Sequence, residues 1–329
     1  MLILSSEDIR KALPMLEVIE AMKQAYASLS SGKADVPLRT RLYIPPQDGI
    51  TLFMPAYVQT DDNEALAVKV VSIFPKNPGK GFPLITAAVL AIEPQTGRAI
   101  ALMEGGAITA IRTGAGSGAA IDILARHDSH VVAIFGAGAQ GRTQLEAACT
   151  VRKIERVWIF DSDTKRAEML AEEMAGQGPI PVDIRIAASG REAALEADII
   201  CTATTATSPV FSDEDVRPGT HISAIGSYRP DMQEVPAETI LRAKVVLDSR
   251  LAVLSESGDL LKPIESGLFT EAHVFAELGD IVLGKKPGRE SFEEITYFKS
   301  VGVAVQDAMA AQLALKNARI MSLGQEIPF

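Results

Sequence analysis

VVAIFGAGAQGRTQLEAA, residues 131–148, joins a short apolar run to three spaced glycines and the start of an amphipathic helix. In this arrangement Gly136 permits a sharp turn, Gly138 leaves room for a pyrophosphate, and Gly141 lets the helix pack closely on the strand. The N–H groups at the start of the helix would then face the phosphates. The stretch therefore predicts a strand, a phosphate-binding turn and a helix, as in dinucleotide-binding folds.

An acidic residue follows this turn at the distance expected of such folds. Asp161 ends the next apolar segment, where a carboxylate accepts hydrogen bonds from the adenosine ribose and repels a 2′-phosphate. The same residue also reads as an ordinary turn acid, and Lys165 and Arg166 stand one turn further on. We predict NAD as the cofactor, with NADP left open.

From residue 130 the chain alternates between strand-like and helix-like segments. Predicted strands are HVVAIF (130–135), RVWIF (156–160), VDIRI (182–186), ADIICTAT (197–204), HISAIG (221–226) and KVVLD (244–248), with helices starting at Gln140, Asp163 and Ser189. This alternation predicts a parallel sheet covered by helices on both faces. Thr202 and the Ser227–Asp231 segment would lie at the carboxyl edge of that sheet, where ligands bind.

The first 125 residues have a different pattern. Residues 5–33 predict one amphipathic helix with Ser6 as its N-cap and apolar residues through Leu16, Ile19, Met22 and Tyr26. Extended segments TRLYIP (40–45), ITLFMPAYV (50–58), LAVKVVSIFP (66–75) and AAVLAIEP (87–94) predict an antiparallel or mixed sheet. Residues 105–125 predict a helix rich in small residues, and 301–319 predict a last helix that packs back on this first domain.

Three cations stand in apolar surroundings. Lys69 lies between valines, a costly place for an ammonium group without a partner, although an edge-strand lysine could reach solvent. Arg41 and Arg112 offer guanidinium forks that match a carboxylate. We expect all three to converge on a small anionic substrate.

Composition narrows the classes of function. The chain has 329 residues, 47% of them hydrophobic, and a formal charge of −10, which disfavours nucleic acid as a partner. We expect a cytoplasmic protein, because no apolar stretch is long enough to cross a membrane and the N-terminus does not resemble a signal peptide. The cysteines, Cys149 and Cys201, are expected to be reduced and buried. The four histidines are not grouped as metal ligands, so we expect no metal.

Several longer motifs resemble the ornithine cyclodeaminase and mu-crystallin family. They are LFMPAY, VKVVSIFPKNPGKGFP, MEGGAITAIRTGAGSGAA, IFGAGAQG, ESGDLL, ELGDIVLGKKPGR and EITYFKSVGVAVQDAMAA, which span nearly the whole chain in the order of the family. The resemblance implies a Rossmann-type doubly wound parallel sheet (126–299) inserted into an α+β substrate-binding and dimerisation domain (1–125 and 300–329). It also implies a homodimer.

The resemblance assigns site residues by matching positions. Substrate contacts would come from Arg41, Lys69, Arg112, Arg229 and Val301. Cofactor contacts would come from Gly136, Gly138, Ala139, Gln140, Gly141, Asp161, Thr202, Ile222, Ser223, Ala224, Ile225 and Ser300. Lys69 and Arg112 are also expected to take part in catalysis, with Glu256 as the acid that keeps an imine protonated and Asp231 as the reserve candidate.

Two positions depart from relatives of this family. Tyr228 stands where cyclodeaminases and archaeal alanine dehydrogenases carry an aspartate, and Leu84 replaces a small hydroxylated residue. The leading hypothesis is therefore NAD(P)H-dependent reduction of the C=N bond of a small cyclic ketimine carboxylate such as pyrroline-2-carboxylate. The alternatives are an ornithine cyclodeaminase, an alanine-type dehydrogenase and a non-catalytic NAD(P)H-binding protein.

Overall fold

The computed structural model describes residues 1–61 and 63–328. The chain divides into two compact units. Unit 1 contains Met1–Arg112 and the segment from Val303 to the C-terminus, and unit 2 contains Thr113–Gly302. The division differs from the expected 125/126 and 299/300, because the first boundary falls inside helix α3 (Gly105–Leu124), which begins in unit 1 and continues into unit 2.

Unit 1 contains an eight-stranded mixed sheet. Its strands are β1 (Leu2–Leu4), β2 (Ala34–Asp35), β3 (Thr40–Ile44), β4 (Gly49–Gln59), β5 (Glu64–Ile73), β6 (Ile85–Ile92), β7 (Ala99–Glu104) and β16 (Gln325–Glu326). Strands β3 to β7 pair antiparallel with their neighbours, whereas β1 runs parallel to β7. The long β4–β5 pair places Met54 opposite Lys69.

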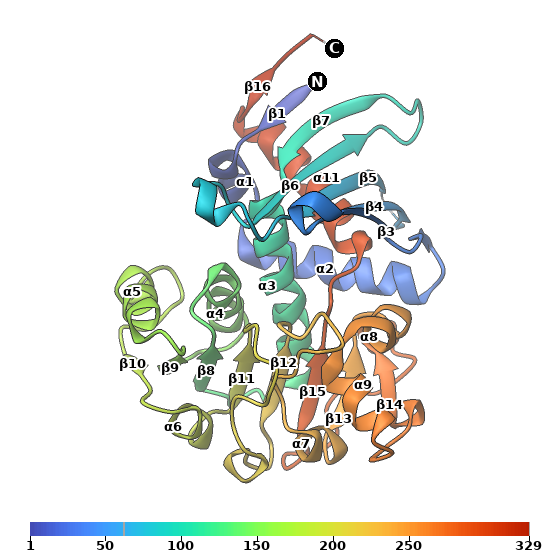
Figure 1. Cartoon of the computed structure of the whole chain (residues 1–329). Helices are drawn as coiled ribbons and strands as arrows, with labels where there is room; N and C mark the ends of the chain where they lie inside the picture. Colours follow the sequence, from blue (N-terminus) through green and yellow to red (C-terminus); the bar gives the residue numbers. More distant parts are fainter. Residues whose placement is uncertain (62, 329) are drawn as a thin grey trace. The chain divides into compact units, whose positions relative to one another are not determined.

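The last helix, α11 (Ala304–Met321), packs against α2 (Met15–Ser30) and across β4 and β5 within unit 1 (Figure 1). The expected return of this helix to the first domain is therefore seen. The buried residues of α11 include Ala304, Ala308, Ala310, Ala311, Ala314 and Ala318, whose small side chains permit close packing. This packing brings an acidic residue of α11 to the level of Lys69.

The N-terminal segment forms two helices, where the sequence predicted one. Helix α1 (Ser6–Ala12) ends before Pro14, which has no N–H and disfavours a helical conformation of Leu13. The N-cap is Ser5 and not Ser6, because the Ser5 hydroxyl accepts a hydrogen bond from the Asp8 N–H at 3.2 Å. Leu16, expected on the apolar face, is exposed.

Unit 2 is a parallel eight-stranded sheet with helices between the strands. The strands are β8 (Val131–Phe135), β9 (Arg156–Phe160), β10 (Ile184–Ile186), β11 (Ile199–Thr202), β12 (His221–Ala224), β13 (Lys244–Leu247), β14 (Val274–Glu277) and β15 (Thr296–Lys299). The helices are α4 (Ala139–Val151), α5 (Thr164–Met174), α6 (Gly190–Leu195), α7 (Ala237–Leu241), α8 (Arg250–Glu256), α9 (Gly258–Glu265) and α10 (Leu278–Val282). Short 3₁₀ helices η1 (Pro45–Gln47), η2 (Pro78–Lys80), η3 (Asp213–Asp215) and η4 (Glu271–His273) lie in connections of the two units.

The strand order in unit 2 is β10-β9-β8-β11-β12-β15-β13-β14 (Figure 1). The order reverses between β8 and β11, the switch point at which doubly wound sheets bind ligands. Strand β15 comes late in the chain but lies between β12 and β13. The predicted doubly wound sheet, inserted between two segments of an α+β unit, is confirmed.

Both faces of this sheet are buried. Along β8, Val131, Ala133 and Phe135 belong to one core cluster, and Val132 and Ile134 belong to another on the opposite face. Burial on both faces explains the nearly continuous apolar composition of the strands. Cys149 and Cys201 lie in the second cluster as free, buried thiols, as expected, and burial raises the pKa of the Cys149 thiol to about 12.

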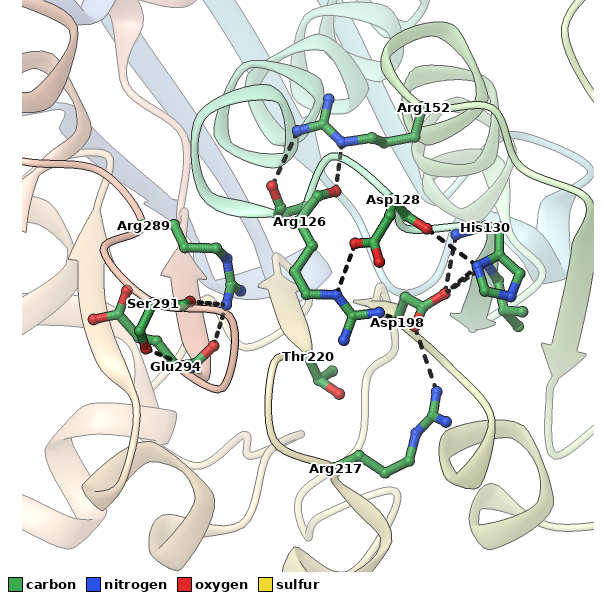
Figure 2. Close-up of polar contacts among 12 residues, drawn as sticks. Arg126, Asp128, His130, Arg152, Asp198, Arg217, Thr220, Arg289, Ser291 and Glu294 are labelled. Carbon is green, nitrogen blue, oxygen red and sulfur yellow. Dashed lines mark hydrogen bonds and ion pairs between the residues drawn. The ribbon is translucent and has the colours of Figure 1, made fainter.

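At the amino edge of the same sheet, charged side chains form hydrogen bonds with backbone groups and with one another (Figure 2). Asp198, just before β11, accepts hydrogen bonds from the backbone N–H groups of His130 at 3.0 Å and Val131 at 3.1 Å, and from Arg126 Nη2 at 2.8 Å. Arg152 donates to carbonyl oxygens at the C-terminus of α3, where a cation is favourable. These contacts hold the edge of the sheet opposite to the glycine turn.

No helix among residues 1–61 and 63–328 combines the length and the apolar composition that a membrane span requires.

Candidate active site

The glycine turn of unit 2 has the geometry that its sequence predicts. Gly136 has a φ of +98°, and a Cβ there would lie 2.5 Å from the Ala203 carbonyl oxygen. A Cβ on Gly141 would lie 2.0 Å from the Gly136 carbonyl oxygen, so α4 packs against the turn at a distance that only glycine permits. A Cβ on Gly138 would meet no atom within 4 Å. The middle glycine therefore faces open space.

This open space is suited to a phosphate group. Gly138 is the N-cap of α4, and no side chain caps the helix. The first N–H groups of a helix lack acceptors within the helix, so this end offers donors and a partial positive charge. The residues present thus fit a bound pyrophosphate, with Gly136, Gly138, Ala139, Gln140 and Gly141 forming the turn and the first helical residues.

Asp161 directly follows β9 and is bonded to the glycine turn. Its Oδ2 accepts a hydrogen bond from the Ala137 N–H at 2.7 Å, and its Oδ1 accepts one from the Asp163 N–H at 2.9 Å. The carboxylate therefore has a fixed position beside the turn. Each carboxylate oxygen has a further lone pair for a ribose hydroxyl.

The remaining predicted cofactor residues lie in or directly after strands β11, β12 and β15 of this sheet. Thr202 ends β11 and Ile222, Ser223 and Ala224 lie in the neighbouring β12, followed by Ile225; all are buried. Ser300 and Val301 follow β15. Asp248 Oδ2 accepts hydrogen bonds from Ser300 Oγ at 2.7 Å and the Val301 N–H at 3.1 Å, and so fixes this turn.

A buried carboxylate that the sequence did not reveal lies beneath the ends of β11 and β12. Glu234 accepts hydrogen bonds from the hydroxyl group of Thr202 and from the backbone N–H and the hydroxyl group of Thr204. It also accepts the N–H groups of Gly226 and Ser227, and all five distances are 2.6 to 3.0 Å. Burial raises the pKa of Glu234, and the nearby Lys299 opposes this effect.

Glu234 is itself held by a second buried acid. Asp259 Oδ1 accepts a hydrogen bond from the Glu234 N–H at 2.7 Å, and Asp259 Oδ2 forms an ion pair with Lys299 at 3.3 Å. All three side chains are inaccessible to solvent. The carboxyl edge of the sheet therefore rests on a fixed charged cluster.

In unit 1, Lys69 and Arg112 are brought together by Asp307 of α11. Asp307 Oδ2 lies 2.7 Å from Lys69 Nζ, and Asp307 Oδ1 lies 3.0 Å from Arg112 Nε. Lys69 is 2%, Arg112 5% and Asp307 1% exposed. Two cations and one carboxylate thus form a buried site with a net positive charge.

A buried polar chain supports this cluster from behind. Arg112 Nη1 donates to Gln306 Oε1 at 2.7 Å, and Gln306 Nε2 donates to the Tyr26 hydroxyl at 2.7 Å. Two of the three guanidinium nitrogens of Arg112 are therefore engaged by α11. The orientation of this arginine is set by the C-terminal helix.

The charges around Lys69 change its acidity. Burial lowers the pKa of Lys69 to about 8; Asp307 opposes this shift, and Arg112 and Arg39 add to it. Burial opposes ionisation of Asp307, yet Arg112 and Lys69 lower the pKa of that carboxyl. Burial therefore makes the Lys69 ammonium group a stronger acid than that of an exposed lysine, while Asp307 favours its protonated form.

Among the predicted cations, Lys69 and Arg112 meet, while Arg41 lies on β3 with an exposed side chain. Arg39, just before β3, was not predicted, but its charge acts on both Lys69 and Asp307. The available signal was a second arginine two residues before Arg41 in the stretch RTRLYIP (39–45).

The two predicted acids of unit 2 lie in different settings. Glu256 ends α8 and is buried. Asp231 is exposed and forms two contacts with Arg229, at 3.0 and 2.7 Å. Hydrogen bonding to Arg229 lowers the pKa of Asp231, which makes it a poor proton donor at neutral pH. Arg229, expected to bind substrate, forms an exposed ion pair with this carboxylate.

Comparison with known proteins identifies relatives along the whole chain. Residues 1–321 match the ornithine cyclodeaminase/mu-crystallin family. A Delta(1)-pyrroline-2-carboxylate reductase of Bacillus cereus is 41% identical over 330 residues, which cover 100% of both chains. The solved structure of the Thermococcus litoralis Delta(1)-pyrroline-2-carboxylate reductase in complex with NADH and L-proline is 46% identical, with a TM-score of 0.93 over 99% of this chain and 100% of that one. An archaeal alanine dehydrogenase dimer with bound NAD is 33% identical, with a TM-score of 0.91 over 100% of this chain and 99% of that one.

Proposed function

Since this chain belongs to the ornithine cyclodeaminase/mu-crystallin family, we propose that it is an NAD(H)-dependent reductase of a small cyclic ketimine carboxylate such as pyrroline-2-carboxylate, forming an L-amino acid. The observation that carries the proposal is the buried Lys69–Asp307–Arg112 cluster, which offers net positive charge and a releasable proton. Relatives that are Delta(1)-pyrroline-2-carboxylate reductases support the substrate class.

In this proposal, unit 2 binds the cofactor and unit 1 binds the substrate. Unit 2 binds the dinucleotide through the glycine turn and Asp161, and the carboxylate of Asp161 favours NAD over NADP. A nicotinamide bound there would supply the hydride for reduction of the C=N carbon. Unit 1 binds the substrate acid and forms the homodimer, in keeping with the archaeal relative solved as a dimer.

Side chains of unit 1 supply charge and a proton. Arg112 binds the substrate carboxylate, and its contacts with Asp307 and Gln306 hold the guanidinium in place. Lys69 Nζ holds a proton that balances the charge of the bound acid and can move to the substrate nitrogen. Arg39 and Arg41 add positive charge from the segment at β3. Glu256 of unit 2, buried at the end of α8, is the alternative candidate for protonating the imine nitrogen.

An assay with purified protein tests this function. Pyrroline-2-carboxylate and NADH are mixed with the wild type, and the loss of reduced-nicotinamide absorbance is followed with Lys69→Met as the control. We expect turnover by the wild type and a loss of about a hundredfold or more in the variant, in the range of a lost proton-transfer group. Equal rates for the two proteins would refute the role of Lys69.

The same preparation distinguishes the alternatives. Ammonia-dependent reduction of pyruvate in place of ketimine reduction would indicate an alanine-type dehydrogenase. Conversion of ornithine to proline without net use of cofactor would indicate a cyclodeaminase. NADH binding without any of these reactions would indicate a non-catalytic binding protein.

A further inference from the structure

We propose that Glu234 is a positioning residue for the dinucleotide site, because its buried carboxylate holds the chain after β11 and the chain after β12 in their binding conformation. The inference rests on the proposed function, since it assumes that these strand ends bind the dinucleotide. Glu234 itself touches no ligand in this scheme and acts through the segments it binds.

The contacts of Glu234 reach across two strand ends. On the β11 side it binds Thr202 Oγ1 at 3.0 Å and the Thr204 N–H at 2.6 Å. On the β12 side it binds the N–H groups of Gly226 at 2.7 Å and Ser227 at 3.0 Å. A single side chain therefore satisfies donors from both segments, just where the sheet ladder no longer pairs them.

The segment held by Glu234 is in contact with the glycine turn. The Ala203 N–H donates to the Phe135 carbonyl oxygen at 2.8 Å. The Ala203 carbonyl oxygen lies 2.5 Å from the position that a Cβ of Gly136 would take. A shift of Thr204 would therefore move the atoms that pack against Gly136, the first residue of the phosphate-binding turn.

The chemistry of the site requires a carboxyl group with two acceptors. Oε1 accepts the Thr204 N–H, and Oε2 accepts the N–H groups of Gly226 and Ser227. Since each oxygen receives at least one backbone N–H, an amide NH₂ in either position would face a donor. Glu234→Gln must therefore leave a buried N–H without its partner.

Asp198 provides a matched control at the other end of the same strands. It is also a buried carboxylate that accepts two backbone N–H groups, those of His130 and Val131. Asp198 and His130 are labelled in Figure 2. Because it lies before β11 and not after it, Asp198→Asn should reduce stability without altering the carboxyl edge. Comparing Glu234→Gln with Asp198→Asn therefore distinguishes a general loss of stability from a specific loss of order at the dinucleotide site.

The experiment measures NADH binding by fluorescence and thermal unfolding for the wild type, Glu234→Gln and Asp198→Asn. We expect the dissociation constant of NADH to rise about tenfold in Glu234→Gln, the effect of a lost buried hydrogen bond, and to change by less than about twofold in Asp198→Asn. Both variants should unfold at lower temperatures. Equal NADH affinity in the wild type and Glu234→Gln would overturn the inference.

A second variant decides the matter if Glu234→Gln does not fold. Thr204→Val removes one hydroxyl donor from Glu234, keeps the side-chain shape and changes no residue expected to contact the cofactor. A severalfold weaker NADH affinity supports the positioning role, and an unchanged affinity with a lower unfolding temperature refutes it. Failure of the wild type to bind NADH at all would instead contradict the proposed function, so the two failures are distinguishable.

Discussion

Asp307 Oδ2 in the C-terminal helix α11 lies 2.7 Å from Lys69 Nζ in strand β5, with both side chains buried. The pair joins the end of the chain to the sheet of unit 1. The effect of the pair is electrostatic. Burial lowers the pKa of the Lys69 ammonium group, and the Asp307 carboxylate opposes this shift and so favours the protonated form.

The first prediction concerns pH. The pKa of Lys69 is lowered to about 8, so its proton is present below that pH and lost above it. If reduction requires the protonated lysine, kcat/KM should fall as the pH rises through about 8. A pH profile of ketimine reduction measures this. An unchanged rate up to about pH 10, near the usual pKa of lysine, would contradict the assignment.

The second prediction concerns Asp307→Asn. Removing the carboxylate removes an interaction that raises the pKa of Lys69, so the alkaline limb should move to lower pH. Arg112 also loses the carboxylate that holds its guanidinium group in place. Because Arg112 binds the substrate carboxylate in this proposal, KM for the substrate should rise about tenfold, the effect of a lost charged hydrogen bond. The control is Glu20→Gln, which removes a surface carboxylate from Lys23 in α2 of the same unit. If both variants have the wild-type pH profile, Asp307 does not tune the lysine.

A third prediction compares two glycines of one turn. In Gly138→Ala the new Cβ meets no protein atom within 4 Å, so the unfolding temperature should stay near the wild-type value while NADH affinity falls. In Gly141→Ala the Cβ would lie 2.0 Å from the Gly136 carbonyl oxygen, and stability should fall by roughly 1–3 kcal/mol. Denaturant unfolding and NADH titration separate the two effects. Undiminished NADH binding by Gly138→Ala would mean that the phosphates bind elsewhere.

The fourth prediction concerns the choice between NAD and NADP. Asp161→Ser removes the charge that repels a 2′-phosphate, so the ratio of NADH to NADPH efficiency should fall toward one. Both cofactors should bind more weakly, because the Ala137 N–H loses a carboxylate acceptor. Asp163→Ser is the matched control, since serine also caps α5. An unaltered preference in Asp161→Ser would assign the selection to another group.

Patterns within short stretches of the sequence predicted individual strands and the glycine turn, because these depend on residues close together in the chain. The alternation after residue 130 predicted β8, β9, β10, β11, β12 and β13, and the spacing of Gly136, Gly138 and Gly141 predicted the turn. Strands β1, β2 and β16 were missed, because segments of two or three residues are too short to display an alternation. Strand β7 was long enough to be recognised and was also missed.

The partners of the predicted site residues could not be predicted, because they depend on contacts between distant segments. Lys69 and Arg112 were recognisable as cations in apolar surroundings, but nothing local identified Asp307 as their common partner. One signal was available: Asp307 is an acid within an apolar, alanine-rich helix, where an unpaired carboxylate is costly. Glu234, in a polar loop, carried no comparable signal.

The position of β15 between β12 and β13 has a consequence for biosynthesis. During translation the first five strands of unit 2 can assemble and β13 and β14 can pair with each other, but these two parts of the sheet cannot join until residues 296–299 leave the ribosome. Unit 1 waits longer still, because α11 covers β4 and β5. Both units thus finish folding only after residues 296–321 have been made, so nascent chains that stall before this point expose unpaired sheet edges to chaperones and proteases.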